Sequence, residues 1–360
     1  MNMGGKYYMD LQIKRILLIV GVTCIISLLF MFVIKKIAVH IGAFDIPDAR
    51  KVHKKPIPRL GGLGIYFGFL IGYMLFGQHS LEMNAILIGS FIIIITGVID
   101  DIKPIPAKYK FLGQLFGASI VPLYGGILLK DISAFGLYVE FGILSYPITI
   151  LFIVSVINCI NLIDGLDGLS GGISCIYFLT IGIISVIMGN NNTLDVVLTF
   201  IMLGSTLGYL YHNFYPATIF MGDSGSMFLG YIIAVIALLG FKNVTLTSFI
   251  IPVLLLAIPI MDTAFAIIRR TLKKEPISKP DKEHLHHQIL NMNLSQRATV
   301  LIIYGIDMLF ATASIVYVIG DSNLGIIIYS ILLIFVIWLV TCTNIVKKHD
   351  TKKKWLFLKK

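Results

Sequence analysis

Eleven long apolar runs follow one another along this chain, and they limit its possible folds more than any other feature. Each run holds about 16 to 22 residues, and a helix of about 20 apolar residues can cross the hydrocarbon core of a bilayer. The runs are 16–34, 60–77, 84–99, 111–129, 143–160, 170–188, 195–212, 226–241, 247–268, 299–319 and 324–345. They predict an all-α, polytopic integral membrane protein with about eleven transmembrane helices.

Composition supports this class and excludes others. Apolar residues make up 57% of the chain and charged residues only 13%, a balance typical of proteins whose surface faces lipid. Long alternating strands, the signature of an outer-membrane barrel, are missing from the sequence. Water-soluble enzymes and DNA-binding proteins are therefore excluded, and no nucleic-acid partner is expected.

The placement of basic residues orients the chain. Of the 29 Lys and Arg residues, 24 fall in the loops 35–59, 100–110 and 269–298 and in the tail after residue 345. Loops rich in Lys and Arg stay in the cytoplasm, so the N-terminus is expected outside and the C-terminus inside. The same bias favours the count of eleven, because one missing helix would invert every later loop.

The sequence thus predicts a single multi-span catalytic domain, 1–345, in the cell membrane. A basic cytoplasmic tail, 346–360, follows it and is expected to contact anionic lipid headgroups. Costly polar residues near the spans gather at the cytoplasmic ends, whereas the outer loops hold nothing comparable. The segments that form this expected active face are 35–59, 100–110, 159–170, 212–226 and 269–298.

Adjacent acids close the third run. Asp100 and Asp101 repel each other, and the negative end of a helix dipole adds to the cost, unless a cation or a proton donor compensates. Lys110 follows within ten residues, and the group can bind a phosphorylated ligand. A solvated helix end is the alternative explanation.

Polar residues recur every third position after the fifth run. Asn158, Asn161, Asp164 and Asp167 lie along one face of a helix end that unwinds at glycines. Their oxygens suit a hard cation or a nucleotide. An ordinary helix end and turn would need only one Asp and one Gly.

Phe220 to Ser226 opens the eighth run with an acid, two hydroxyls and glycines. Asp223 is consistent with a simple N-cap, but a helix N-terminus is also an anion site. Beside Asp100, Asp101 and Asn161, the better interpretation is a shared Mg²⁺ site, because Mg²⁺ is usually held by one or two carboxylates and substrate phosphates.

Two basic segments complete the cytoplasmic face. His284, His286 and His287 lie among Lys and Arg in the late loop, where a polyphosphate is favoured over zinc because no second ligand pair matches. The early loop, with Lys51 and Arg59, adds a second basic wall. Of the acids within the predicted spans, Asp262 precedes Arg269 by seven residues and is expected to support that face, whereas Asp307 has no assigned role.

These motifs, in this order, resemble those of the polyprenyl-phosphate N-acetylhexosamine-1-phosphate transferase family, glycosyltransferase family 4. The resemblance covers nearly the whole chain. Its motifs are Arg50 to Gly62, Asp100–Asp101 with Lys110 to Gln114, Asn158 to Gly168, Phe220 to Ser226, and Asp281 to His287.

The resemblance implies a role for most of these residues. Asp223 and Asn161 match the residues that hold the metal, and Asp100, Asp101 and Lys110 match the essential acids and the phosphate-binding lysine. Asp167 and Phe220 match positions that contact uracil, and the positions of Asn158, Asp164, Lys51 and Arg59 are expected to bind substrate. The three histidines and Arg270 resemble the loop that closes over the sugar phosphate.

The resemblance also implies the substrates. The peptidoglycan branch, which uses UDP-MurNAc-pentapeptide, has three consecutive histidines and ten spans, whereas His-Leu-His-His and eleven spans resemble the branch that uses UDP-GlcNAc or another UDP-N-acetylhexosamine. We expect GlcNAc-1-phosphate transfer to undecaprenyl phosphate with release of UMP, Mg²⁺ as cofactor with Mn²⁺ as an alternative, and a downstream surface glycan such as teichoic acid or O-antigen.

Several alternatives stay open at this stage. Direct attack by the lipid phosphate and a two-step route through an aspartyl intermediate both fit the motifs, and a homodimer is compatible with them. An ion-coupled transporter is the competing class, because broken helices with acids also mark carriers. The transporter is disfavoured because the polar groups lie at one surface and no half of the sequence repeats.

Overall fold

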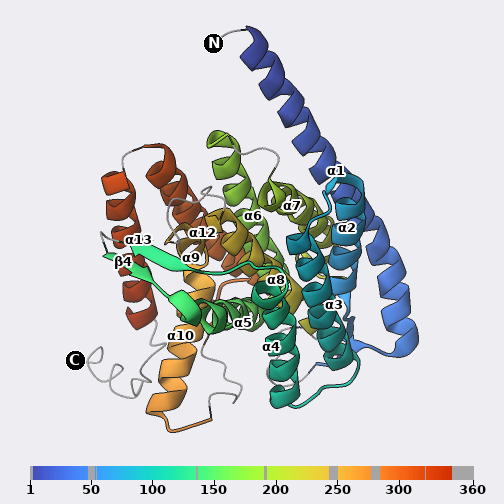
Figure 1. Cartoon of the computed structure of the whole chain (residues 1–360). Helices are drawn as coiled ribbons and strands as arrows, with labels where there is room; N and C mark the ends of the chain where they lie inside the picture. The colour runs from blue at the N-terminus through green and yellow to red at the C-terminus, as the bar shows by residue number, and fades with distance from the viewer. Residues whose placement is uncertain are drawn as a thin grey trace, which may run out of the picture.

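The computed structural model describes residues 3–47, 53, 55–134, 137–189, 193–242, 250–276, 284–320 and 322–342. The described part is a bundle of helices with two short pairs of antiparallel strands, and α1 extends beyond the rest of the bundle at its N-terminal end (Figure 1). The predicted basic tail, 346–360, lies outside the described residues, as does Lys51.

Thirteen α-helices form the described part of the chain. They are α1 (Met3–Ile41), α2 (Gly61–Phe76), α3 (Leu81–Ile102), α4 (Ala107–Leu123), α5 (Ser145–Ile163), α6 (Leu169–Ile187), α7 (Leu194–Asn213), α8 (Gly222–Lys242), α9 (Ile250–Leu255), α10 (Ala257–Leu272), α11 (Leu285–Leu290), α12 (Gln296–Ile319) and α13 (Ser322–Cys342). Strands β1 (Phe44–Asp45) and β2 (Ile57–Pro58) pair antiparallel, as do β3 (Asp131–Ala134) and β4 (Leu137–Glu140).

Seven of the described helices are long and apolar enough to cross a membrane, and two more apolar helices, Gly61–Phe76 and Leu324–Trp338, are shorter. The ninth predicted run is not one continuous helix in the described residues, because α9 ends at Leu255 and α10 begins at Ala257. The all-α, multi-span class is therefore confirmed in its main feature.

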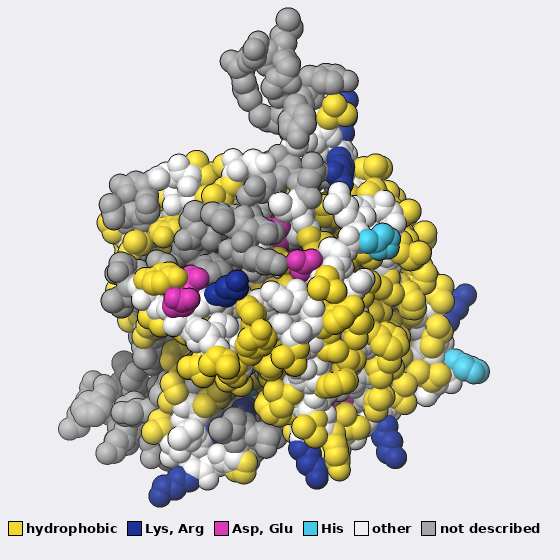
Figure 2. Space-filling view, in the orientation of Figure 1, with side chains coloured by type: hydrophobic (Ala, Val, Ile, Leu, Met, Phe, Trp, Pro, Cys, Tyr) yellow, Lys and Arg dark blue, Asp and Glu magenta, His cyan; other side chains and the backbone are white. Residues whose placement is uncertain are grey.

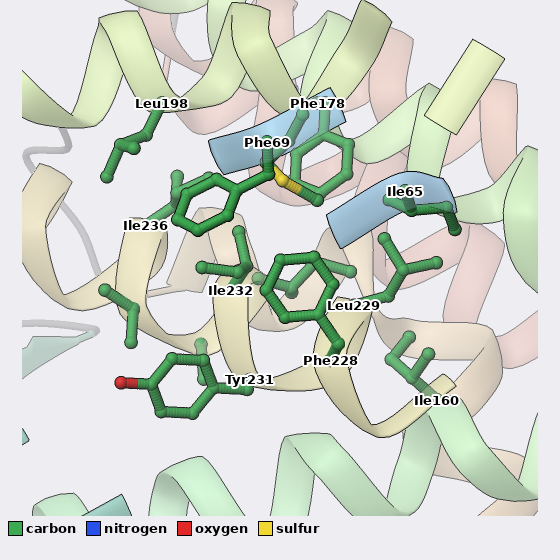
Figure 3. Close-up of a cluster of buried hydrophobic side chains, with 14 of the residues drawn as sticks. Ile65, Phe69, Ile160, Phe178, Leu198, Phe228, Leu229, Tyr231, Ile232 and Ile236 are labelled. Atoms are coloured by element: carbon green, nitrogen blue, oxygen red, sulfur yellow. The ribbon is translucent and has the colours of Figure 1, made fainter. Parts of the chain in front are cut away.

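Helix α8 lies at the centre of the bundle. Its apolar side chains from Met227 to Leu239 are almost completely buried around the whole helix, the pattern expected of a helix enclosed by others. It packs against α2, α3 and α5. Figure 3 shows the contact, with Phe228 and Ile232 of α8 beside Phe69 of α2.

The outer surface is hydrophobic. Leu17, Phe91, Leu151 and Ile334 each expose about half or more of their surface, and one broad face is covered with apolar side chains (Figure 2). A soluble monomer rarely exposes such an area, whereas a bilayer accommodates it without cost.

Three helices extend further than the apolar runs predict, and this places the polar motifs on helix ends. Asp100 and Asp101 belong to the last turn of α3, Asn161 to the last turn of α5, and Asp223 to the first turn of α8. Hydrophobicity marks where side chains meet lipid, but backbone hydrogen bonds continue into the polar region.

Candidate active site

Three helix ends meet in the bundle: the C-terminal ends of α3 and α5 and the N-terminal end of α8. A Cβ added to Gly97 of α3 would lie 2.3 Å from the Cα of Ser224, so glycine is needed for this approach. Gly222 has a φ of 72°, and a Cβ there would lie 2.3 Å from Asp101 Oδ2. Only glycine satisfies both the backbone and the space at residue 222.

Asp101 caps α8 from the neighbouring helix. Its Oδ1 accepts a hydrogen bond from Asp223 N at 2.8 Å, and its Oδ2 accepts from Ser224 N at 3.1 Å and Ser224 Oγ at 2.7 Å. These bonds satisfy amides that a helix N-terminus leaves without partners, and they place a negative charge at the positive end of the helix dipole. Asp101 therefore fixes the position of the backbone that carries Asp223.

Lys110 lies between the carboxylates of Asp100 and Asp223. Its Nζ donates to Asp100 Oδ2 at 3.0 Å and also to Asp223 Oδ2. Asp100 Oδ1 accepts from Ile105 N at 3.0 Å, which fixes the carboxylate at the end of α3. Burial lowers the pKa of Lys110, but the carboxylates of Asp223 and Asp100 raise it more, so its pKa lies above the usual value. The lysine is therefore a fixed positive charge between two carboxylates.

Asn161 presents its amide from α5 to the same place. Its Nδ2 donates to Ser226 Oγ at 2.8 Å, which orients the side chain against the first turns of α8. The amide also interacts with the carboxylate of Asp223. An amide and a carboxylate from two helices thus lie side by side.

Asp164 follows at the end of α5, beside the same carboxylates. Burial raises the pKa of the Asp164 carboxyl to about 7, and the charges of Asp223 and Asp101 contribute to the rise. The guanidinium of Arg59 opposes it. A bound cation would favour the ionised form of this carboxyl.

The loop between α5 and α6 is held against the segment that follows α7. Asp167 Oδ2 accepts from Ala217 N at 2.9 Å, and Gly168 N donates to Asn213 Oδ1 at 2.9 Å. Gly168 has a φ of 80°, a conformation that favours glycine. Asp167 is therefore partly engaged in holding this loop.

The early loop docks on the residues that precede α8. Phe220 N donates to Pro58 O at 2.8 Å, and Gly61 N donates back to Phe220 O at 2.9 Å. Arg59 forms an ion pair with the buried Asp45. The ring of His53 packs edge-on against Phe220, with centroids 5.1 Å apart. Arg59 of the predicted basic wall thus lines the site.

A cavity of about 290 Å³ lies between these segments. Its lining combines acids and amides with basic and aromatic groups from segments far apart in the sequence. The lining residues are Asp45, His53, Arg59, Asn161, Asp164, Gly165, Leu166, Asp167, Asn213, Phe220, Met221, Gly222, Asp223, His287 and Gln296. Such a lining suits a ligand with hydroxyl groups and a flat ring, and it accommodates anionic groups when a cation offsets its four carboxylates.

The histidine segment, residues 284–287, lies at the rim of this cavity. His287 lines it, and a Cβ added to Gly165 would lie 2.4 Å from His286 Nε2. His284 and His286 have parallel rings with centroids 5.8 Å apart. The short helix α11 therefore packs directly on the loop that carries Asp164 and Asp167.

The comparisons with known proteins agree with this geometry. Residues 83–241 match the model of glycosyl transferase family 4. A relative from Bacillus subtilis, named a probable undecaprenyl-phosphate N-acetylglucosaminyl 1-phosphate transferase, is 43% identical over 344 residues, which cover 94% of this chain and 95% of the relative. This chain belongs to glycosyl transferase family 4.

Two more distant relatives align with most of this chain. The decaprenyl-phosphate N-acetylglucosaminephosphotransferase of Mycolicibacterium smegmatis is 33% identical over 81% of this chain and 79% of its own length. The undecaprenyl-phosphate alpha-N-acetylglucosaminyl 1-phosphate transferase of Escherichia coli K12 is 27% identical, with 76% of each chain covered. The predicted family is therefore confirmed.

Most of the predicted site residues come together in the transferase, but seven of those that the structure describes do not line the cavity: Asp100, Asp101, Lys110, Asn158, Arg270, His284 and His286. Asn158 has a structural contact instead. Its Nδ2 donates to Gln114 Oε1 at 2.8 Å and to Val154 O at 2.8 Å, so it joins α5 to α4. Arg270 is buried at the end of α10. The roles of all these residues in binding and catalysis stay predictions.

Three residues of the cavity carry no sequence signal that our motifs use. Asp45, Asn213 and Gln296 lie at or near element ends, far from one another in the chain. Among these three, only Asn213 has a sequence position that could have indicated a structural role: it follows an apolar run, where polar side chains often bind backbone groups. Asp45 reaches the site only because β1 pairs with β2 and brings it to Arg59.

Proposed function

We propose that this transferase moves GlcNAc-1-phosphate from UDP-GlcNAc to undecaprenyl phosphate and releases UMP. The observation that carries the proposal is Asp223, held by Asp101 at the start of α8 and contacted by Lys110 at the edge of the cavity. The relatives named above act, by their names, on polyprenyl phosphates and N-acetylglucosamine. A UDP-sugar offers the anionic pyrophosphate and flat base that this lining suits.

The orientation belongs to the same proposal. Eleven spans, with the cavity at the cytoplasmic surface, place 24 of the 29 basic residues inside. A lipid phosphate then reaches the cavity from the membrane, whereas the water-soluble nucleotide sugar reaches it from the cytoplasm. The apolar outer surface supports the arrangement, because one substrate remains in the bilayer throughout.

The donor set fits Mg²⁺, which we include in the proposal. The side chains of Asp223 and Asn161 are adjacent and supply a carboxylate and an amide, and Mg²⁺ needs only one or two protein oxygens beside substrate phosphates and water. No group of three or more His, Cys, Asp or Glu forms a closed cage within the described residues. When bound, Mg²⁺ would neutralise charge on the pyrophosphate oxygens.

The reaction requires little from the protein beyond positioning and charge. An oxygen of the lipid phosphate attacks the β-phosphorus of the UDP-sugar, and the bond from that phosphorus to the bridging oxygen breaks, so UMP leaves. Lys110 and the basic residues of the rim stabilise the charge that develops. We expect Asp100 to orient the acceptor through Lys110, to which it is bonded, whereas Asp101 caps α8.

Release of UMP by the purified protein in lipid vesicles tests the proposal. The wild type should release UMP from UDP-GlcNAc only when undecaprenyl phosphate and Mg²⁺ are present. Asp223→Asn should lower the rate by about 10² to 10³, the usual cost of removing one transition-state charge contact. Asp307→Asn, the same chemical change in a different buried acid, should stay within about twofold.

A panel of UDP-sugars settles the donor. Release from UDP-MurNAc-pentapeptide alone, or from another UDP-N-acetylhexosamine alone, would correct the sugar but keep the chemistry. Absence of release from every UDP-sugar by a folded wild type would contradict the proposed function.

A further inference from the structure

Asp262 of α10 is a buried acid whose two oxygens serve different partners. Oδ2 lies 2.8 Å from His284 Nδ1, and Oδ1 accepts from Leu285 N at 2.8 Å. Only 4% of the Asp262 surface and 6% of the His284 surface are exposed. A hydrogen bond between groups shielded from water holds its geometry more firmly than one at the surface.

These two contacts fix the start of α11. The six-residue helix has no side-chain cap of its own at His284, and the carboxylate of Asp262 supplies a cap from another helix. An ionised carboxylate can only accept hydrogen bonds. Nδ1 of His284 must therefore carry a proton, which sets the orientation of the ring.

The positions of His286 and His287 depend on how the first turn of α11 is held. His286 packs on Gly165 with no room for a side chain there, and His287 lines the cavity. Because a helix of six residues behaves as a short rigid unit, a rotation of its first turn would move both rings.

Helix α10 also carries the buried arginines. Ala266, Arg269 and Arg270 are buried along with Asp262, and the spacing of 262, 266 and 269 places these residues on one face. The helix thus presents Asp262 to the histidine segment and ends in two guanidinium groups.

We propose that Asp262 is a positioning residue: it holds His284 in the tautomer protonated at Nδ1 and thereby orders the histidine segment over the cavity. The inference rests on the proposed function for its kinetic consequence, but its structural part does not require activity. Asp262 itself contacts no substrate and acts through His284.

Asp262→Asn is the sharpest test because it preserves the shape of the side chain. Asn can still accept from Leu285 N through its oxygen, but its NH₂ group then faces His284 and favours an unprotonated Nδ1. We expect kcat/KM for UMP release to fall about 10- to 100-fold, the usual cost of losing a partner that orients a functional histidine. The loss should lie mainly in kcat. Asp307→Asn should remain within about twofold.

A double-mutant cycle distinguishes positioning from a general loss of structure. His284→Asn removes the group through which Asp262 acts, so Asp262→Asn should cost little more in that background. If the two losses multiply, Asp262 does not act through His284 and the proposal is wrong. Equal losses for Asp262→Asn and Asp307→Asn would also overturn it.

Histidine NMR gives a readout that needs no substrate. With ¹⁵N- and ¹³C-labelled histidine, the signal lost in His284→Asn identifies residue 284, and its shifts report which ring nitrogen is protonated in the neutral form. We expect protonation at Nδ1 in the wild type and at Nε2 in Asp262→Asn. An unchanged tautomer would contradict the proposal, and an inactive wild type with the expected signals would contradict the proposed function alone.

Discussion

At the scale of single residues, the adjacent acids at the end of α3 have different tasks. Asp101 accepts three hydrogen bonds from Asp223 and Ser224, whereas Asp100 pairs with Lys110. The sequence shows two equivalent carboxylates, and only their partners separate a capping group from one that faces a cation.

The capping role predicts a graded loss of stability. Asp101→Asn keeps one accepting oxygen but places its NH₂ group against the donors at the other position, which leaves one buried backbone amide without an acceptor, so it should lower the free energy of unfolding by about 1–3 kcal/mol. Ser224→Ala removes only the hydroxyl and keeps both amide bonds, so it should cost about 1 kcal/mol or less. Thermal unfolding in detergent measures both changes. Equal costs would show that the amide bonds contribute nothing beyond the hydroxyl.

At the scale of elements, the approach of α3 to α8 creates the site. The backbones come so close at Gly97 that no Cβ fits, and this contact places the acids of α3 on the first turn of α8. Helix packing in membranes commonly uses small residues in this way.

Gly97→Ala should therefore lower stability and activity together. The added methyl group overpacks the contact, at about 1–3 kcal/mol, and moves Asp101 away from the amides that it caps. Gly305→Ala is a matched control because nothing lies within 4 Å of a Cβ at that helical position. The control should be neutral or slightly stabilising, as measured by thermal unfolding and UMP release. A harmless Gly97→Ala would show that α3 can shift without loss of the site.

At the scale of the whole molecule, the proposed orientation separates two exposed positions. Glu140 on β4 should face outward and Lys274 after α10 should face the cytoplasm. In a background with Cys24, Cys159, Cys175 and Cys342 replaced, a membrane-impermeant maleimide should label Glu140→Cys in intact cells. Lys274→Cys should react only after the membrane is opened. The reverse pattern would invert the topology and contradict a cytoplasmic site.

Sequence alone determined the class and the family of this protein. The thickness of the bilayer sets the length of the apolar runs, and a membrane strongly penalises misplaced charge. Both features can therefore be recognised in the sequence without knowledge of tertiary contacts. The ordered motifs likewise indicated the family, because their chemistry requires particular residue types. The family and the main helical class were confirmed, whereas the count of eleven spans and the orientation stay predictions.

Tertiary structure decided which of those residues meet and what each holds. Asn158 and Asn161 share a helix face in the sequence pattern, yet one binds Gln114 and the other reaches Ser226. The partners of Asp262, His284 and Leu285, became evident only from the contact between α10 and the start of α11. A hydrogen bond between distant segments depends on distance and angle in three dimensions. Local residue order cannot specify either quantity.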